Sequence, residues 1–160
     1  MTVFDILNVE LFSATLQERG RLLGLDLGRK SIGIAISDSN WKIASPLLRI
    51  KRRKFRQDVQ QLIGLIETEN IQGLVLGWPL NMNGSEGPRT QSTYAFERNL
   101  KNFVHLPTLF WDERLSSLSA DKAMLEGNLS RIKRAHKIDK IAASIILQSA
   151  INCLSAIQKS

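Results

Sequence analysis

The sequence has 160 residues, which is enough for one domain with a substantial core and too few for two domains of typical size. The 43% hydrophobic content is that of a globular protein, and neither a bilayer-spanning apolar run nor a secretion signal is visible, so we expect a soluble, cytoplasmic protein. The net charge of +7 suits a polyanion such as nucleic acid, and the single cysteine, Cys153, excludes an internal disulfide and a cysteine metal cluster.

The first part of the chain predicts an antiparallel meander behind an N-terminal extension. Residues 1–20 carry a weak helical pattern that ends at a glycine, so we expect an appended helix or arm. Apolar residues alternate over 21–27 and again over 31–37, which predicts two strands joined by a tight turn. A third strand over 46–51 completes the meander, because the connections are too short for helical crossovers.

The middle of the chain changes to alternating helices and strands. Apolar residues recur at helical spacing from 55 to 70, and the apolar run 73–77 that follows predicts a buried parallel strand. Turn residues fill 80–90, which we expect to be a loop, and a helix with apolar residues over 96–103 follows it. A fifth strand is expected over 108–111.

The last part of the chain is expected to be helical, with one basic loop. A short helix is predicted from 116 or 117 to 126, then a loop over 127–137, then a mostly buried helix over 138–157. The element order is βββαβαβαα, which predicts an α/β fold: a mixed five-stranded sheet flanked by helices, in one domain over 21–157.

Two clusters of basic residues carry much of the positive charge. They consist of Arg49, Lys51, Arg52, Arg53, Lys54 and Arg56, and of Arg131, Lys133, Arg134, His136 and Lys137. Such clusters suit nucleic acid, because neutralising phosphates releases counterions. They are equally typical of a solvated surface, since charge alone reports on solubility. Charge therefore leaves both interpretations open.

Three acidic residues at the ends of predicted elements are candidate metal ligands. Asp26 lies opposite the apolar face of the first predicted strand, among glycines, alanine and serine that leave room for something bulky. Glu113 follows the fifth strand, where adjacent residues alternate in direction, so Asp112 is expected to face the other way. Asp139 is expected two or three residues into the last helix.

Each of these acids also has an ordinary structural interpretation. Asp26 could be a hydrogen-bonded strand residue, Glu113 a solvated strand end, and Asp139 a first-turn acid that complements the helix dipole. Their joint presence favours catalysis, because carboxylate oxygens bind Mg²⁺ and two such ions can clamp the attacking and leaving oxygens of a phosphodiester.

Four segments resemble, in order, the motif blocks of the YqgF family, which is also called RuvX. They are residues 25–35 (LDLGRKSIGIA), 76–84 (LGWPLNMNG), 111–116 (WDERLS) and 138–143 (IDKIAA). The resemblance extends over about residues 21–152. The chain departs from the family pattern at Asn83, where the family often has Asp, and at Trp78, where it has a smaller or more polar residue.

This resemblance implies an RNase H-like fold and a metal-dependent nuclease that matures the 5′ end of 16S rRNA. The catalytic and metal-binding residues that it implies are Asp26, Glu113 and Asp139, with Mg²⁺ or Mn²⁺ as cofactor in a two-metal site. The partner would be pre-rRNA, on its own or on the ribosomal small subunit. The family was earlier described as Holliday-junction-resolvase-like, so a four-way DNA junction is the alternative substrate.

Candidate substrate contacts are basic and polar residues near these motifs. They are Arg29, Lys30, Asn81, Arg114, Arg52, Arg53 and Arg134. A binding module without catalysis is a further alternative, which would not need all three acids. The segment 25–35 also looks like a phosphate loop of the actin, Hsp70 and sugar-kinase superfamily, but those proteins need two such domains and 160 residues hold only one.

Overall fold

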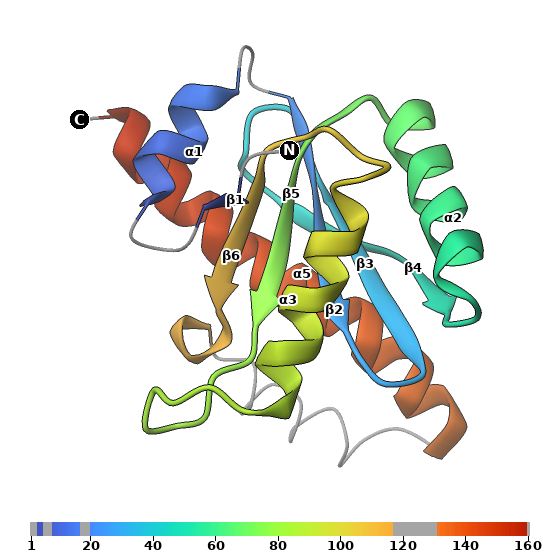
Figure 1. The fold of residues 1–160 in the computed structure, drawn as a ribbon. Helices are drawn as coiled ribbons and strands as arrows, with labels where there is room; N and C mark the ends of the chain where they lie inside the picture. The colour runs from blue at the N-terminus through green and yellow to red at the C-terminus, as the bar shows by residue number, and fades with distance from the viewer. Residues whose placement is uncertain (1–2, 5–7, 17–19, 117–130, 160) are drawn as a thin grey trace.

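The protein folds around one twisted mixed sheet (Figure 1). The computed structural model describes residues 3–4, 8–16, 20–116 and 131–159, with the side chains of 3–4, 131–139 and 158–159 outside the description. The strands are β1 (Val3–Phe4), β2 (Arg21–Leu27), β3 (Ser31–Ser37), β4 (Ala44–Lys51), β5 (Ile71–Trp78) and β6 (Thr108–Asp112). Their order in the sheet is β1-β6-β5-β2-β3-β4.

The pairing confirms the predicted fold class. β2, β3 and β4 form an antiparallel meander, and β5 and β6 are added in parallel on the other side of β2. Each of the five predicted strands is present. The sheet gains a sixth strand, β1, which pairs in parallel with β6. A strand of two residues has no alternating period, and the sequence pattern therefore could not reveal it.

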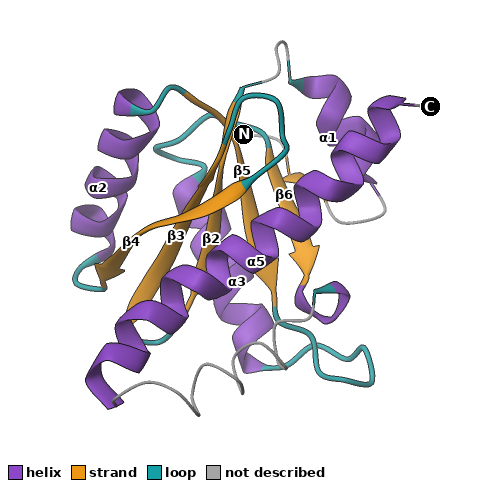
Figure 2. Ribbon diagram, turned by 180° about the vertical axis from the view of Figure 1, so that it is seen from behind, coloured by secondary structure: helices purple, strands orange, loops and turns teal. Residues whose placement is uncertain are grey.

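Helices cover both faces of the sheet (Figure 2). On one face lie α2 (Phe55–Thr68) and α3 (Pro88–Leu100), whose apolar residues pack with Leu23, Leu25 and their neighbours. On the other face lie α1 (Val9–Thr15) and α5 (Arg131–Lys159), which share a second apolar cluster. α3 begins inside the predicted loop 80–90, because Pro88 has the fixed φ that suits the first turn of a helix.

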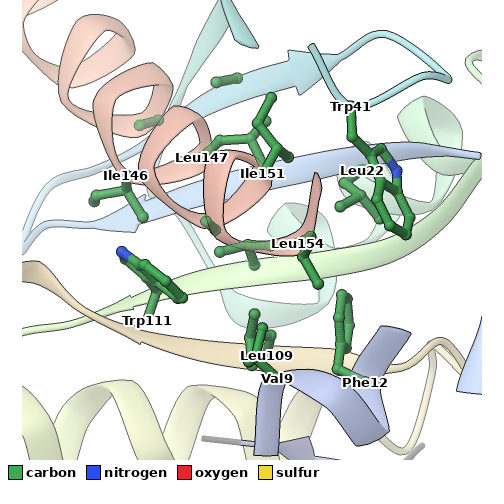
Figure 3. Packing of buried hydrophobic residues seen from close by; sticks show 14 of the residues in the cluster. Val9, Phe12, Leu22, Trp41, Leu109, Trp111, Ile146, Leu147, Ile151 and Leu154 are labelled. Carbon is green, nitrogen blue, oxygen red and sulfur yellow. The ribbon is translucent and has the colours of Figure 1, made fainter. Parts of the chain in front are cut away.

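The N-terminal segment contributes to the core. Val9 and Phe12 of α1 are buried in the same cluster as Leu109, Ile151 and Leu154. Figure 3 shows Phe12 lying beneath Leu154 of α5, with Leu109 of β6 next to Val9. The segment predicted as an appended arm therefore supplies both a strand and buried side chains to the sheet and its covering layer.

Helix α5 begins earlier than the sequence pattern predicted. Residues 131–137 were expected to be part of a loop, but they lie in α5, which runs from Arg131 to Lys159. Arg, Lys, Ala and Ile are good or adequate helix formers, and this stretch holds no Gly or Pro that would stop a helix. The rest of the predicted loop, and the predicted helix beyond Ser116, lie outside the described residues.

The apolar length of α5 is explained by its position over the sheet. Its segment Lys140–Ile157 has the length and mean hydropathy of a membrane-spanning helix. Ala143, Ile146, Leu147 and Ala150 of that segment are fully buried against the strands. The hydropathy of α5 is thus that of a core helix.

The smallest residues on the α5 face of the sheet allow this helix to approach closely. A Cβ built on Gly24 would lie 2.7 Å from the Cβ of Leu147 and 3.1 Å from the backbone oxygen of Ala143. Both distances are shorter than van der Waals contact. The space that the sequence predicted beside Asp26 is therefore filled, at Gly24, by α5 itself.

The turn between β3 and β4 is held by the carboxylate of Asp38. Its Oδ1 accepts hydrogen bonds from the backbone N–H of Lys42 at 2.7 Å and of Ile43 at 3.0 Å. Within the turn, Trp41 has a positive φ of 57° and a side chain that is 1% exposed. Its indole N–H donates to the Gly20 carbonyl at 2.8 Å, so the turn is fastened to the start of β2.

We expect this turn to make stability depend on pH. Burial alone would raise the pKa of Asp38, but backbone N–H groups of Ile43, Lys42 and Asn40 outweigh it and lower the pKa below 3.8. A carboxylate whose pKa is lowered on folding stabilises the fold above its unfolded pKa, and this contribution is lost as pH falls through the folded pKa. An Asp38→Asn variant should therefore be less stable than the parent at neutral pH and equally stable in strong acid. Denaturant unfolding at both pH values measures this, and an equal deficit at the two would contradict it.

Candidate functional site

Two of the candidate acids, Asp26 and Glu113, lie where parallel strands end at one edge of the sheet. β2, β5 and β6 run in the same direction, and Asp26, Trp78 and Asp112 occupy their last or second-to-last positions. The carboxyl ends of neighbouring parallel strands are the usual position of binding sites in open α/β sheets. The structure therefore brings β2 and the segment after β6 to one edge.

Asp26 lies on the face of the sheet that α5 covers. It stands two residues after Gly24, which faces Leu147 and Ala143 of α5, and strand residues two apart point the same way. Its cross-strand neighbour on β3 is Gly33. Only 7% of Asp26 is exposed. The carboxylate is thus held near α5 by a buried strand.

The carboxylate of Asp112 forms an ion pair with Arg114. Its Oδ2 accepts from Nη2 at 2.7 Å and from Nε at 3.1 Å, while its Oδ1 accepts from Nε and from the backbone N–H of the same arginine. Burial by itself would raise the pKa of Asp112, but these hydrogen bonds and the positive charge of Arg114 lower it. Asp112 also caps the short 3-10 helix η2 (Glu113–Leu115). Its carboxylate therefore holds the chain that follows β6 in position.

Glu113 lies on the opposite side from Asp112. Its Cγ and Cδ are each 3.3 Å from the position of a Cβ built on Gly77, and Ile146 of α5 lies 2.8 Å from the same point. The Glu113 side chain therefore crosses β5 on the α5 face, which is also the face of Asp26. The neighbour of Asp112 across the strand pair is Trp78 of β5. The Trp78 ring packs against Phe110 in the apolar cluster on the α3 side of the sheet.

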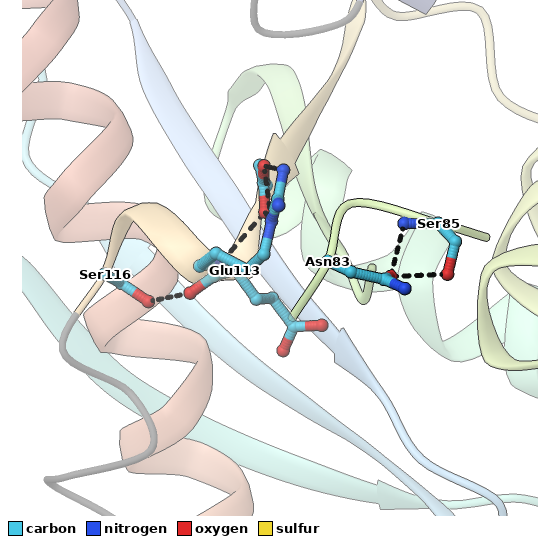
Figure 4. Close-up of polar contacts among 6 residues, drawn as sticks. Asn83, Ser85, Glu113 and Ser116 are labelled. Atoms are coloured by element: carbon cyan, nitrogen blue, oxygen red, sulfur yellow. Dashed lines mark hydrogen bonds and ion pairs between the residues drawn. The ribbon is translucent and has the colours of Figure 1, made fainter. Parts of the chain in front are cut away.

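Figure 4 shows how the backbone around Glu113 is fixed. The hydroxyl of Ser116 donates to the Glu113 carbonyl at 2.9 Å, which closes the turn of η2. The Glu113 side chain extends away from this turn. Across from it, the amide of Asn83 points toward Ser85, whose backbone N–H and hydroxyl both donate to its Oδ1.

Asp139 lies well inside α5. Because the helix already includes Arg131, Asp139 is not a first-turn acid, and the helix-dipole interpretation from the sequence is wrong. Position 139 is one helical turn before Ala143, whose carbonyl oxygen lies close to Gly24. Its side chain is outside the described part of the chain, in which no group of three or more His, Cys, Asp or Glu could hold a metal ion.

The structure gathers four of the candidate basic contacts at the turn between β2 and β3. Arg29 and Lys30 are exposed in this turn. The backbone N–H of Arg52 donates to the Lys30 carbonyl at 2.8 Å, and its guanidinium donates to the Gly28 carbonyl at 2.7 Å. Arg53 is exposed just beyond. The first basic cluster therefore folds against the residues that follow Asp26.

The other candidate contacts lie elsewhere. Asn81 begins a tight loop in which its side-chain amide donates to the Ser85 hydroxyl at 2.9 Å. Gly84 of this loop has a φ of +87°, and the Arg114 guanidinium lies 3.2 Å from a Cβ built on it. Arg114 thus connects the end of β6 to the loop after β5. Arg134 lies in α5, with its side chain outside the described residues.

Sequence reasoning missed Arg89, which lines a cleft together with Arg29 and Arg52. It belongs to neither basic cluster, and a single basic residue beside Pro88 gives no pattern. The sequence feature that could have placed Arg89 at a helix N-terminus is Pro88, since proline is common at the first position of a helix.

Comparisons with known proteins agree with this geometry. Residues 20–153 match the family model described as RuvX, Holliday junction resolvase. A protein of Paracoccus denitrificans named "Putative pre-16S rRNA nuclease" is 52% identical over 147 residues, covering 92% of this chain and 93% of the relative. A relative of the same name from Rhodobacter capsulatus is 52% identical over 144 residues, covering 90% of this chain and 91% of the relative.

Solved structures of two resolvases share the fold. Thermus thermophilus RuvC in complex with a Holliday junction is 11% identical with a TM-score of 0.54, covering 88% of this chain and 97% of RuvC. A yeast mitochondrial Holliday junction resolvase is 13% identical with a TM-score of 0.52, covering 94% of this chain and 86% of the other. The chain therefore belongs to the RuvX (YqgF) family and has the RNase H-like fold of the resolvases.

Proposed function

We propose that this protein is a metal-dependent endonuclease that hydrolyses phosphodiester bonds during maturation of the 5′ end of pre-16S rRNA. The observation that carries the proposal is the placement of Asp26 and Glu113 on one face of the sheet, while Asp112 is paired with Arg114 on the other. Pre-16S rRNA is proposed as the substrate because relatives with 52% sequence identity to this chain are named for it. The nuclease domain would comprise residues 21–157, and residues 1–20 would be an extension that adds to its sheet.

The donor atoms near the strand ends fit a hard divalent cation. Asp26 and Glu113 offer only carboxylate oxygens, which are the ligands of Mg²⁺ and Mn²⁺, and we assign Asp139 as the third ligand. Two such ions, when bound, would supply Lewis acidity at the phosphate and a more acidic water. The burial of Asp26 gives this chain a fixed anionic anchor, because a packed strand and α5 restrict its position.

The remaining residues of the site would bind and orient the substrate. The bidentate pairing with Asp112 fixes the Arg114 fork, so its Nη1 beside Gly84 would present a positioned charge to a phosphate. Arg29, Lys30 and Arg53 are exposed and would bind flanking phosphates. Asn81 and Arg134 complete the set of proposed contacts. We place this activity in the cytoplasm, where precursor rRNA is processed, with nucleic acid as the partner and no membrane.

A Holliday-junction resolvase is the second candidate function. The matching family is described as a Holliday junction resolvase, and the chain shares the fold of RuvC; both favour this function. Both substrates present phosphodiesters, so the same carboxylates and arginines would serve either reaction. The substrate difference must then arise from the shape of the nucleic acid.

Cleavage assays with both substrates test the proposal. The purified protein is incubated with precursor 16S rRNA and with a four-way DNA junction, each with Mg²⁺, with Mn²⁺ and with a chelator. We expect metal-dependent cleavage near the 5′ end of the precursor and little cleavage of the junction. Cleavage of the junction alone would make the resolvase the better assignment. Binding without cleavage of either, under every metal condition, would support a module without catalysis.

A further inference from the structure

A basic cleft lies at the end of β2, on the α3 side of the sheet. It has a volume of about 240 Å³ and lies between the β2–β3 turn and the first turns of α3. Its lining consists of Leu27, Gly28, Arg29, Arg52, Pro88, Arg89, Ser92 and Thr93. Three arginines from three different segments therefore converge on one small space, and the described residues that line it include no carboxylate.

Within the described part of the chain, no carboxylate neutralises the charge of these arginines. None of Arg29, Arg52 and Arg89 forms an ion pair with a carboxylate of the described residues. Arg52 is nevertheless held in place, by a 2.7 Å hydrogen bond to the Gly28 carbonyl and by the Phe96 ring, whose centroid is 5.7 Å from its Cζ. Like charges that converge without a counterion repel each other, so an anion in the cleft would be favoured.

The start of α3 adds to this preference for an anion. Arg89 follows Pro88 in the first turn of the helix, where the dipole is positive. Pro88 has no backbone N–H, so the N–H donors of this turn come from the residues after it. Ser92 lines the same space, and the hydroxyl of Thr93 donates to the Arg89 carbonyl at 2.9 Å. The cleft thus combines planar guanidinium donors with a helix N-terminus, which suits the tetrahedral oxygens of a phosphate.

The cleft and Asp26 are neighbours along β2 but open on opposite faces. Leu27 and Gly28 of the lining directly follow Asp26, and Leu27 packs in the cluster on the α2 and α3 side of the sheet. A nucleic-acid strand that crosses the end of β2 would meet the carboxylate side first and the cleft next. We propose that the cleft binds a phosphodiester of the substrate strand remote from the cleaved bond. This inference rests on the proposed nuclease function.

The salt dependence of metal-free binding tests the cleft. Single-stranded RNA is titrated with the protein in a chelator over a series of salt concentrations. An Arg89→Gln variant should weaken binding to all sequences and reduce the slope of log K against log salt by about one unit. Arg89→Lys, which keeps the charge, should retain most of the slope. Arg89 is exposed, so we expect both variants to fold.

Arg21→Gln is the matched control. Arg21 starts β2 at the opposite end of the strand and forms an exposed 2.7 Å ion pair with Glu69, which contributes little to stability. The parental slope is expected for this variant, and a parental slope for Arg89→Gln would overturn the proposal. This titration measures binding without metal and does not depend on cleavage. An absence of cleavage in the separate activity assay would therefore count against the nuclease function but not against the cleft as a binding site.

A titration with inorganic phosphate separates a substrate phosphodiester from a free anion. The protein is titrated calorimetrically with phosphate in the absence of RNA. Weak binding that Arg89→Gln abolishes, together with the lower slope for RNA, supports the proposal. Tight phosphate binding that depends on Arg89 while the RNA slope is unchanged would identify a free-phosphate site and contradict it.

Discussion

Replacing Asp26 with Asn is expected to lower the cleavage rate by several orders of magnitude while leaving metal-free RNA binding unchanged or tighter. The substitution keeps the shape of a side chain that is 93% buried, and removes the charge that anchors the cation. Without metal, the Asp26 carboxylate repels phosphates, so its neutralisation can only help binding. Single-turnover cleavage and a metal-free titration of the same preparation measure the two effects.

Asp38→Asn is the matched control for this variant. Asp26 lies within β2, whereas Asp38 follows β3 at the opposite end of the same sheet, where its carboxylate accepts hydrogen bonds from backbone N–H groups of a turn. Its replacement should leave the cleavage rate at the parental value under conditions where the protein is folded. Cleavage by Asp26→Asn at the parental rate would assign the measured activity to another site or to a contaminant.

Gly24→Ala is expected to destabilise the fold by about 1–3 kcal/mol. The new methyl group would lie 2.7 Å from the Cβ of Leu147 and 3.1 Å from the Ala143 carbonyl oxygen, so the backbone of α5 must move away from the sheet. Because α5 also carries Asp139, we expect cleavage to fall even at temperatures where the variant is folded. Denaturant unfolding measures the first effect and single-turnover cleavage the second.

The same substitution at Gly64 should have the opposite sign. Gly64 lies in the interior of α2, and a Cβ built there meets nothing within 4 Å. Alanine loses less conformational freedom than glycine on folding into a helix, so Gly64→Ala should stabilise the protein by about 0.5–1 kcal/mol. Equal stabilities for the Gly24 and Gly64 variants would show that α5 does not pack on β2 as tightly as the structure indicates.

Much of the sheet could be predicted because its strands repeat a simple period. Alternating or continuous apolar residues identified the five longer strands, and their short connections identified the meander. The two residues of β1 carry no period, and their pairing with β6 depends on contacts far along the chain. Tertiary pairing, which no local pattern encodes, therefore decided the outer strand.

The early start of α5 was missed for a different physical reason. The charge of residues 131–137 was interpreted as a solvated loop, whereas lysine and arginine are compatible with a helix whose other residues supply the buried face. The side of the sheet that Asp112 faces, by contrast, follows from the strand period, since the alternation of β6 continues into its last residue. Glu113 lies just beyond the strand, in η2, and its side chain nevertheless lies on the opposite side. The ion pair between Asp112 and Arg114 forms because the turn of η2 brings the two side chains together, and the sequence pattern does not indicate it.

The two outer strands of the sheet are protected against pairing with other molecules in different ways. An unpaired strand edge is a template for aggregation, and β4 discourages this with Pro46, Arg49 and Lys51 along its length. At the opposite side, β1 has only two residues and so offers little edge, while it pairs with the first residues of β6. We therefore expect the N-terminal residues to shield the start of β6 from pairing with other molecules. Versions shortened at this end would be expected to self-associate before they unfold.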